Sequence, residues 1–241
     1  MKALAASTVL AISLGLGLVA CTREASPPGI AFAPWDKSHA SKPDFAQVDY
    51  AYPIPAAEMA KITPEYLATL EQEQIDQIYA RLTAGPIPDG AFDGKILLPK
   101  GASGKLRLAE IVGGFAGKAL ELKGLMLDDL GEAIWRGKVF YREERVLRNR
   151  IEDLSVLKKM GLVTGEPKKM DFHGKETWLL FPAKLYCGQS LLDARRESII
   201  IDYFFTDEIP GYQENPDFLA GRRGLRVRDE IRMIRPGLYL G

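Results

Sequence analysis

Two aspartates interrupt runs of apolar residues that are typical of β-strands. Asp202 lies in the run RESIIIDYFF, and Asp229 lies in the run RVRDEIRMI. Because side chains alternate along a strand, Asp229 shares the apolar face of its strand with Val227 and Ile231. Asp202 points inward only if the face that it shares with Ile200 is the buried one. A buried carboxylate at either position could serve as a general base.

An inward carboxylate is costly unless it is paired or hydrogen-bonded. Arg148 and Arg150 in the run VLRNRI are candidates to neutralise it, and Asn149 between them could supply amide donors. Two interpretations follow. The first is a buried ion-pair network that fixes the register of the strands, and the second is a mostly apolar pocket in which Asp202, Asp229 and an arginine are the polar anchors.

Aromatic residues could line such a pocket. Trp135 and Gly137 share one face of the run WRGKVFY, and Tyr203 directly follows Asp202. Gly137 either leaves room for a ligand or relieves crowding at a bend in a packed interior. We expect Trp135, Tyr203 and the face of Asp229 to bound a dry cavity. The candidate ligand-binding residues are Trp135, Tyr203, Asp202, Asp229, Arg148 and Arg150.

Other catalytic and metal-binding patterns are incomplete. The segment GGFAGK has Ala119 where a phosphate-binding loop needs Ser or Thr, and Ser190 lacks the second glycine of a nucleophile elbow because Leu192 occupies that position. His39 and His173 have no further ligand at a spacing typical of zinc. We therefore expect no metal and no cofactor.

The N-terminus has the layout of an export signal. Residues 1–20 contain one charge, Lys2, followed by an apolar run that ends at Cys21. The run approaches the roughly 20 residues that span a bilayer, but a polar, proline-rich segment follows it at once. The residues LVAC resemble the bacterial lipobox. This resemblance implies that Cys21 begins the mature chain and carries a lipid, which anchors the protein in the cell envelope. We expect the protein to lie on the periplasmic side of the outer membrane.

Charge and cysteine content limit the partners. Removal of residues 1–20 takes away Lys2, so the 32 basic residues become 31 against 32 acidic ones. A nearly neutral chain has no strong field to hold nucleic acid, so we expect no nucleic-acid partner. If Cys21 carries lipid, Cys187 has no partner for a disulfide within the chain.

The chain divides into a signal peptide (1–20), a lipidated tether (21–55) rich in proline and alanine, and one domain (56–241). Helices are expected at about 63–84, where Thr63 is a suitable N-cap, and at about 106–131. From about 133 to 241 the runs alternate like strands. The predicted fold class is α+β: an N-terminal helical portion followed by an antiparallel sheet curled into a barrel.

Four segments in order, WRGKVF, RNR, SIIIDY and RDEIRMIRPGLYLG, resemble a family of uncharacterised bacterial proteins whose β-rich domain is similar to a lipocalin-type barrel. The resemblance covers about residues 86–241 and implies the barrel fold, but it transfers no catalytic residues. The chain lacks the glycine-aromatic-tryptophan signature of an ordinary lipocalin's first strand.

Three functions remain open. The leading hypothesis is a lipid-anchored protein that binds a small apolar or amphiphilic molecule without transforming it. The second is an enzyme that acts on a lipid-like or carbonyl substrate, with Asp202 or Asp229 as general base and an arginine that holds an oxyanion. The third is a structural or interaction lipoprotein of the envelope, for which the helix at 63–84 would supply the docking surface.

Overall fold

The structure is a computed structural model that describes residues 26–36, 42–97, 100, 135–159, 161, 163, 165–224 and 226–241. Cys21 and the helix expected at 106–131 lie outside these residues. In the described part of the chain, no helix is both long and apolar enough to cross a bilayer.

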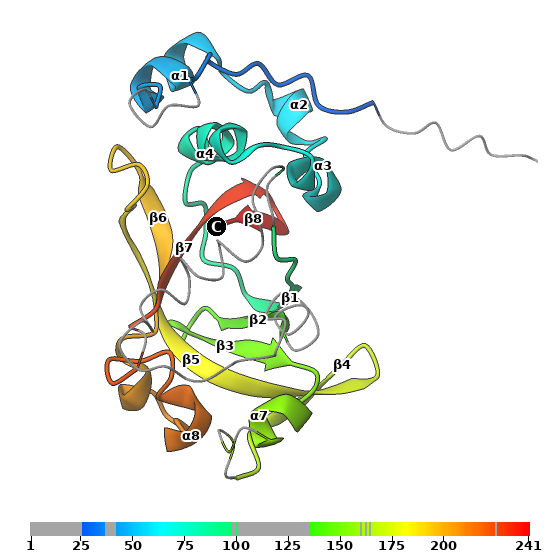
Figure 1. The fold of residues 1–241 in the computed structure, drawn as a ribbon, viewed down its shortest axis with the longest axis vertical. Coiled ribbons are helices and arrows are strands. Elements are labelled where there is room, and N and C mark those ends of the chain that lie inside the picture. Colours follow the sequence, from blue (N-terminus) through cyan, green and yellow to red (C-terminus); the bar gives the residue numbers. More distant parts are fainter. Residues whose placement is uncertain are drawn as a thin grey trace, which may run out of the picture.

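A single antiparallel sheet dominates the described residues (Figure 1). Its strands are β1 (Gly90–Asp93), β2 (Trp135–Tyr141), β3 (Val146–Ile151), β4 (Lys169–Phe172), β5 (Lys175–Gln189), β6 (Glu197–Asp202), β7 (Arg228–Arg235) and β8 (Leu238–Leu240). The strand order is β1-β2-β3-β5-β6-β7-β8, and β4 pairs with β5 outside this path. The prediction of an antiparallel, β-rich second half is therefore confirmed.

The sheet curls into a half-barrel. Phe92 of β1 and Tyr239 of β8 belong to the first and last strands of the path, yet their ring centroids are 5.9 Å apart. Apolar side chains from the strands between them, including Leu147 and Ile201, form one buried cluster on the same face. This face is therefore concave and largely apolar, and the opposite face is convex.

Gly137 permits β1 to pair closely with β2. Its φ is +142°, and a Cβ at this position would lie 2.0 Å from the carbonyl oxygen of Phe92. The register between β2 and β3 shifts between Trp135 and Gly137, which marks a β-bulge. The glycine thus permits the bend and the close approach of a neighbouring strand. This agrees with the interpretation that Gly137 relieves crowding, and not with a role in leaving room for a ligand.

Replacing Gly137 with alanine is expected to lower the free energy of unfolding by about 2–4 kcal/mol, because a strained φ adds to a clash with backbone. Urea unfolding measures this loss. Gly174 is the matched control, since its φ is +76° but a Cβ there would meet nothing within 4 Å. Gly174→Ala should cost about 1–2 kcal/mol, and equal losses at the two glycines would contradict the proposed clash.

The helix predicted at 63–84 is two helices. α3 (Pro64–Ala68) begins at Thr63, whose Oγ1 accepts a hydrogen bond from the Tyr66 amide as expected. A second helix, α4 (Gln72–Ala80), begins after Glu71, because Glu71 and Gln74 form a capping box there. The other helices within the described residues are α1 (Phe45–Ala51), α2 (Ala56–Met59), α7 (Ser155–Lys159) and α8 (Glu214–Asp217), with the 3-10 helix η2 (Thr206–Glu208).

The apolar stripe of α3 and α4 docks on the sheet, as its spacing predicts. Leu67, Leu70 and Ile78 are buried in one cluster with Ile234 of β7 and Leu240 of β8. Since Ile234 alternates away from the concave side, these helices cover the convex side of the last two strands.

Much of the segment that the sequence predicts to be a tether is bound to α4. The amide and carbonyl of Ala33 form two hydrogen bonds with the buried Gln77 side chain, at 2.9 and 3.1 Å. Arg81 Nη1 donates to the carbonyl of Ala31 at 3.0 Å. Residues 26–36, α1 and α2 thus form a layer over α4 at one end of the molecule, which we call the N-terminal layer (Figure 1).

Candidate functional site

A lysine lies at the centre of the polar groups on the concave face. Lys138 in β2 is paired with Asn149 in β3, so both side chains leave the sheet on the same side. Its Nζ lies 2.7 Å from the hydroxyl of Tyr203, 3.1 Å from Oδ1 of Asn149 and 3.3 Å from Oδ2 of Asp229. We call these four residues the Lys138 cluster.

The Lys138 cluster spans the interior of the half-barrel. Lys138 is in β2 and Asp229 is in β7, and three strands separate them in the sheet order. Asn149 Nδ2 also donates to the Tyr203 hydroxyl at 3.0 Å and to the Phe181 carbonyl at 3.1 Å. Only a curled sheet can bring these residues together, so the curl of the sheet positions the site.

The charge of Lys138 is retained inside the half-barrel. Burial alone lowers the pKa of Lys138, but Tyr203 and the Asp229 carboxylate outweigh burial and raise that pKa. For the Tyr203 hydroxyl, burial raises the pKa. At neutral pH the site therefore holds an ammonium group beside a neutral phenol. The side chain of Lys138 is 17% exposed and that of Asp229 is 43% exposed, so solvent reaches the cluster on the Asp229 side.

Trp135 connects the Lys138 cluster to a small cavity. Its Nε1 donates to Asn149 Oδ1 at 2.9 Å, and its ring centroid lies 5.5 Å from Lys138 Nζ. The same indole lines a cavity of about 180 Å³. The residues that line this cavity are Gly94, Lys95, Ile96, Trp135 and Arg136. An apolar wall thus lies next to the polar cluster, and the two cations of the cavity lining, Lys95 and Arg136, form ion pairs with Glu65 and Glu152.

Asp202 lies on the convex face, away from Asp229. Its Oδ2 accepts from the Tyr186 hydroxyl at 2.7 Å, and its Oδ1 accepts from the Phe204 amide at 2.9 Å. Asp229 is paired with Ile201, a residue of the concave cluster, so Asp229 is on the inner face as its pattern indicates. The two aspartates therefore do not form one site.

The arginines do not neutralise Asp229. Arg148 Nη2 donates to the Pro210 carbonyl at 2.5 Å, and the Arg150 guanidinium lies 3.6 Å from the centroid of the Phe172 ring. Since Asn149 points inward, its two neighbours in β3 point outward. Lys138 takes the role expected of an arginine. Strand alternation puts Lys138 on the same face as Phe140, which is buried in the concave cluster.

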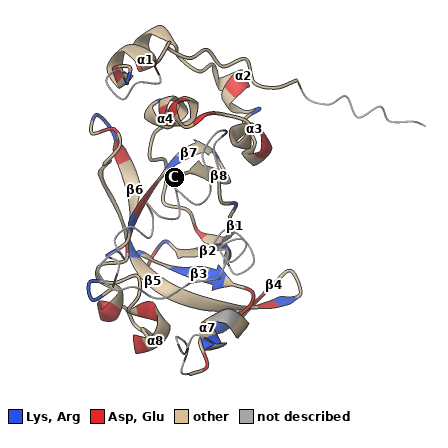
Figure 2. Cartoon of the chain, in the orientation of Figure 1, with Lys and Arg blue, Asp and Glu red and all other residues tan. Residues whose placement is uncertain are grey.

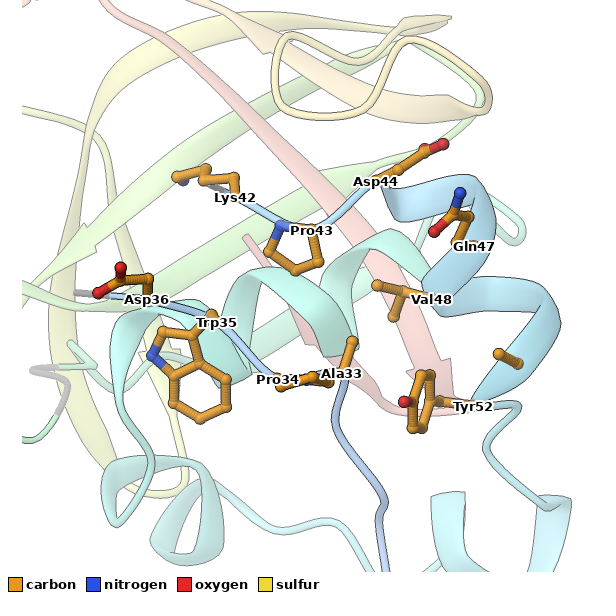
Figure 3. A pocket seen from close by; sticks show the side chains of 11 residues that line it. Ala33, Pro34, Trp35, Asp36, Lys42, Pro43, Asp44, Gln47, Val48 and Tyr52 are labelled. Carbon is orange, nitrogen blue, oxygen red and sulfur yellow. The ribbon is translucent and has the colours of Figure 1, made fainter. Parts of the chain in front are cut away.

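A larger cavity, of about 700 Å³, lies within the N-terminal layer. Figure 3 shows Trp35 and Pro34 on one side of it and Val48 and Tyr52, from α1 and its end, on the other. Its remaining lining residues are Ala33, Asp36, Lys42, Pro43, Asp44, Gln47 and Ala51. Residues 37–41, which include His39 and join two of these residues, lie outside the described part of the chain.

Neither cavity is lined by Tyr203, Asp202, Asp229, Arg148 or Arg150. His173 lies in the turn between β4 and β5, against the Phe172 ring. Within the described ranges, no three His, Cys, Asp or Glu side chains gather to hold a metal ion.

No protein-family model, curated protein or solved structure matches the chain. The functional assignment therefore depends on the geometry of the Lys138 cluster.

Proposed function

We propose that the chain is a lipid-anchored protein of the bacterial envelope, held at the outer membrane through Cys21 and facing the periplasm. We propose further that its curled sheet is a lipocalin-like barrel that binds a small amphiphilic molecule without transforming it. The LVAC run at the end of the apolar N-terminus supports the anchor. The observation that carries the binding function is the Lys138 ammonium group on an apolar concave face, joined through Trp135 to a cavity.

The cavity beside Trp135 suits one part of such a ligand. Trp135 and Ile96 offer an apolar wall, while Lys95 and Arg136 at the rim are paired with Glu65 and Glu152. Its volume of about 180 Å³ is smaller than the roughly 300–1,000 Å³ of a drug-sized pocket. The rest of the ligand would extend along the exposed side of Asp229, with its polar group hydrogen-bonded to the cluster.

The geometry favours binding over acid-base catalysis. A general base needs a carboxylate that is free to reach its substrate. The Asp202 carboxylate is held by Tyr186 on the convex face, and the Asp229 carboxylate faces the Lys138 ammonium group. Neither lies with an arginine that could hold an oxyanion on the concave face.

A docking role for the segment 63–84 is less well supported. The apolar stripe that would form the docking surface is buried against β7 and β8, with Ile78 fully inaccessible to solvent. The segment therefore stabilises the fold instead of offering an apolar surface to another protein.

Native mass spectrometry of the mature chain without Cys21, purified from cells, tests the proposed binding. We expect a folded species that carries an additional mass, which organic solvent extracts as an amphiphilic molecule. A folded species that consistently has the bare mass of the polypeptide, and that takes up no amphiphile when incubated with a cell lipid extract, would contradict the proposal.

A further inference from the structure

The N-terminal layer is attached to the fold at residues that follow Cys21 closely in the sequence. The amide of Gly29 donates to Glu58 Oε2 of α2 at 2.6 Å, and the Ala31 carbonyl accepts from Arg81. Gly29 is eight positions after Cys21, and an extended chain spans at most about 3.5 Å per position, or about 28 Å in all. A lipid on Cys21, as proposed above, would thus keep this layer close to the bilayer.

An uncharged, exposed strip begins next to this attachment. Residues 50–57, with the sequence YAYPIPAA, contain no charged side chain, and Tyr50 is 90% exposed. Ala51, Pro53, Pro55, Ala56 and Ala57 are exposed as well. Arg81 Nη1 donates to the carbonyls of both Ala31 and Tyr52, which places the strip beside the segment that leads to Cys21.

The strip contrasts with the rest of the surface. Figure 2 shows a few charged residues in α1 and α2 and none along the strip between them, whereas charged residues are frequent along the hairpins and around α7 and α8. Tyrosine is enriched at membrane interfaces, where its ring meets the acyl boundary and its hydroxyl meets water. A surface without charges loses little when it displaces the water at a lipid headgroup layer.

We propose that the strip formed by residues 50–57 lies on the lipid surface that holds the Cys21 anchor. This inference rests on the proposed lipidation. It orients the molecule, because α7 and α8 lie at the opposite end of its long axis (Figure 1). The membrane would then contact the N-terminal layer, and the far end of the half-barrel would face away from it.

Quenching by lipids tests this orientation on the full-length, lipidated chain. The exposed Cys187 is first replaced with serine, and a fluorescent thiol reagent is attached at Ala57→Cys or, as the matched control, at Ser155→Cys in α7. Each protein is reconstituted in vesicles of phosphatidylethanolamine and phosphatidylglycerol that contain a headgroup nitroxide lipid. We expect loss of fluorescence at position 57 and none at position 155.

The outcomes separate the orientation from the anchor. Equal quenching at positions 57 and 155, or quenching at neither, in a protein that sediments with the vesicles would overturn the orientation and leave the lipid anchor in place. A chain that is recovered in the soluble fraction with an unmodified Cys21 would overturn the anchor, and the orientation with it.

Discussion

Replacing Arg232 with methionine is expected to lower the free energy of unfolding by about 3–5 kcal/mol, because it takes one of two cations from a buried carboxylate and leaves several buried carbonyls without donors. Arg232 is fully buried, and its Nη1 lies 3.1 Å from Oδ2 of Asp193. The guanidinium also donates to Ser198 Oγ and to the carbonyls of Tyr79 and Arg196, at 3.0, 3.1 and 2.9 Å. Thermal unfolding should show a fall in Tm of roughly 10 °C.

The physical reason lies in how α4 is joined to the sheet. Arg232 in β7 bonds to the end of α4 and to the loop between β5 and β6. Burial tends to raise the pKa of Asp193, but its hydrogen bonds with Arg195 and Arg232 lower that pKa below its usual value. Methionine would remove one of these two cations and leave several buried carbonyls without donors.

Arg223 is the control for Arg232. It is 55% exposed and pairs with Glu214 at the surface. Arg223→Met should therefore change the free energy of unfolding by no more than about 0.5 kcal/mol. A similar, small change for both arginines would contradict the structural role of Arg232.

Replacing Lys138 with methionine is expected to weaken binding of an amphiphilic probe roughly 10-fold to 100-fold, the loss of one hydrogen bond to a charged group. Methionine keeps most of the apolar volume but removes the ammonium group from Tyr203, Asn149 and Asp229. Fluorescence titration with a dansyl-labelled fatty acid measures the affinity. The fold should survive, because Asp229 is partly hydrated and Tyr203 keeps its hydrogen bond with Asn149.

Lys184 supplies the matched control. It lies in β5, and its Nζ pairs with Glu208 at 2.6 Å and is 4.6 Å from the Phe205 ring centroid, away from the Lys138 cluster. Lys184→Met should leave the affinity for the probe unchanged. If both variants bind the probe as the unchanged chain does, the ligand does not bind at the Lys138 cluster.

Most strands of the sheet could be predicted from the sequence. The run VLRNRI, for example, coincides with β3 (Val146–Ile151). β4 (Lys169–Phe172) was not predicted, because its alternation of Lys, Met, Asp and Phe is weakly apolar and it pairs only with β5. Its position depends on the hairpin turn at His173 and Gly174, and not on burial of one face.

The site was harder to predict than the fold. Alternation alone placed Asp229 inward, which agrees with the structure, whereas the expectation that Arg148 or Arg150 would neutralise it was wrong because Lys138 pairs with it. Which residue crosses the interior to meet Asp229 depends on the curl of the sheet, and the sequence carries no direct signal for curl. The bulge at β2 also brings Trp135 to the side of Lys138, against simple alternation.

A crystal structure of the chain with its copurified ligand tests the central proposal most directly. We expect density that lies against the Trp135 indole and whose polar group is within hydrogen-bond distance of Lys138 or Asp229. Ligand density elsewhere, with the Lys138 cluster unchanged and the Trp135 cavity filled by water alone, would contradict it.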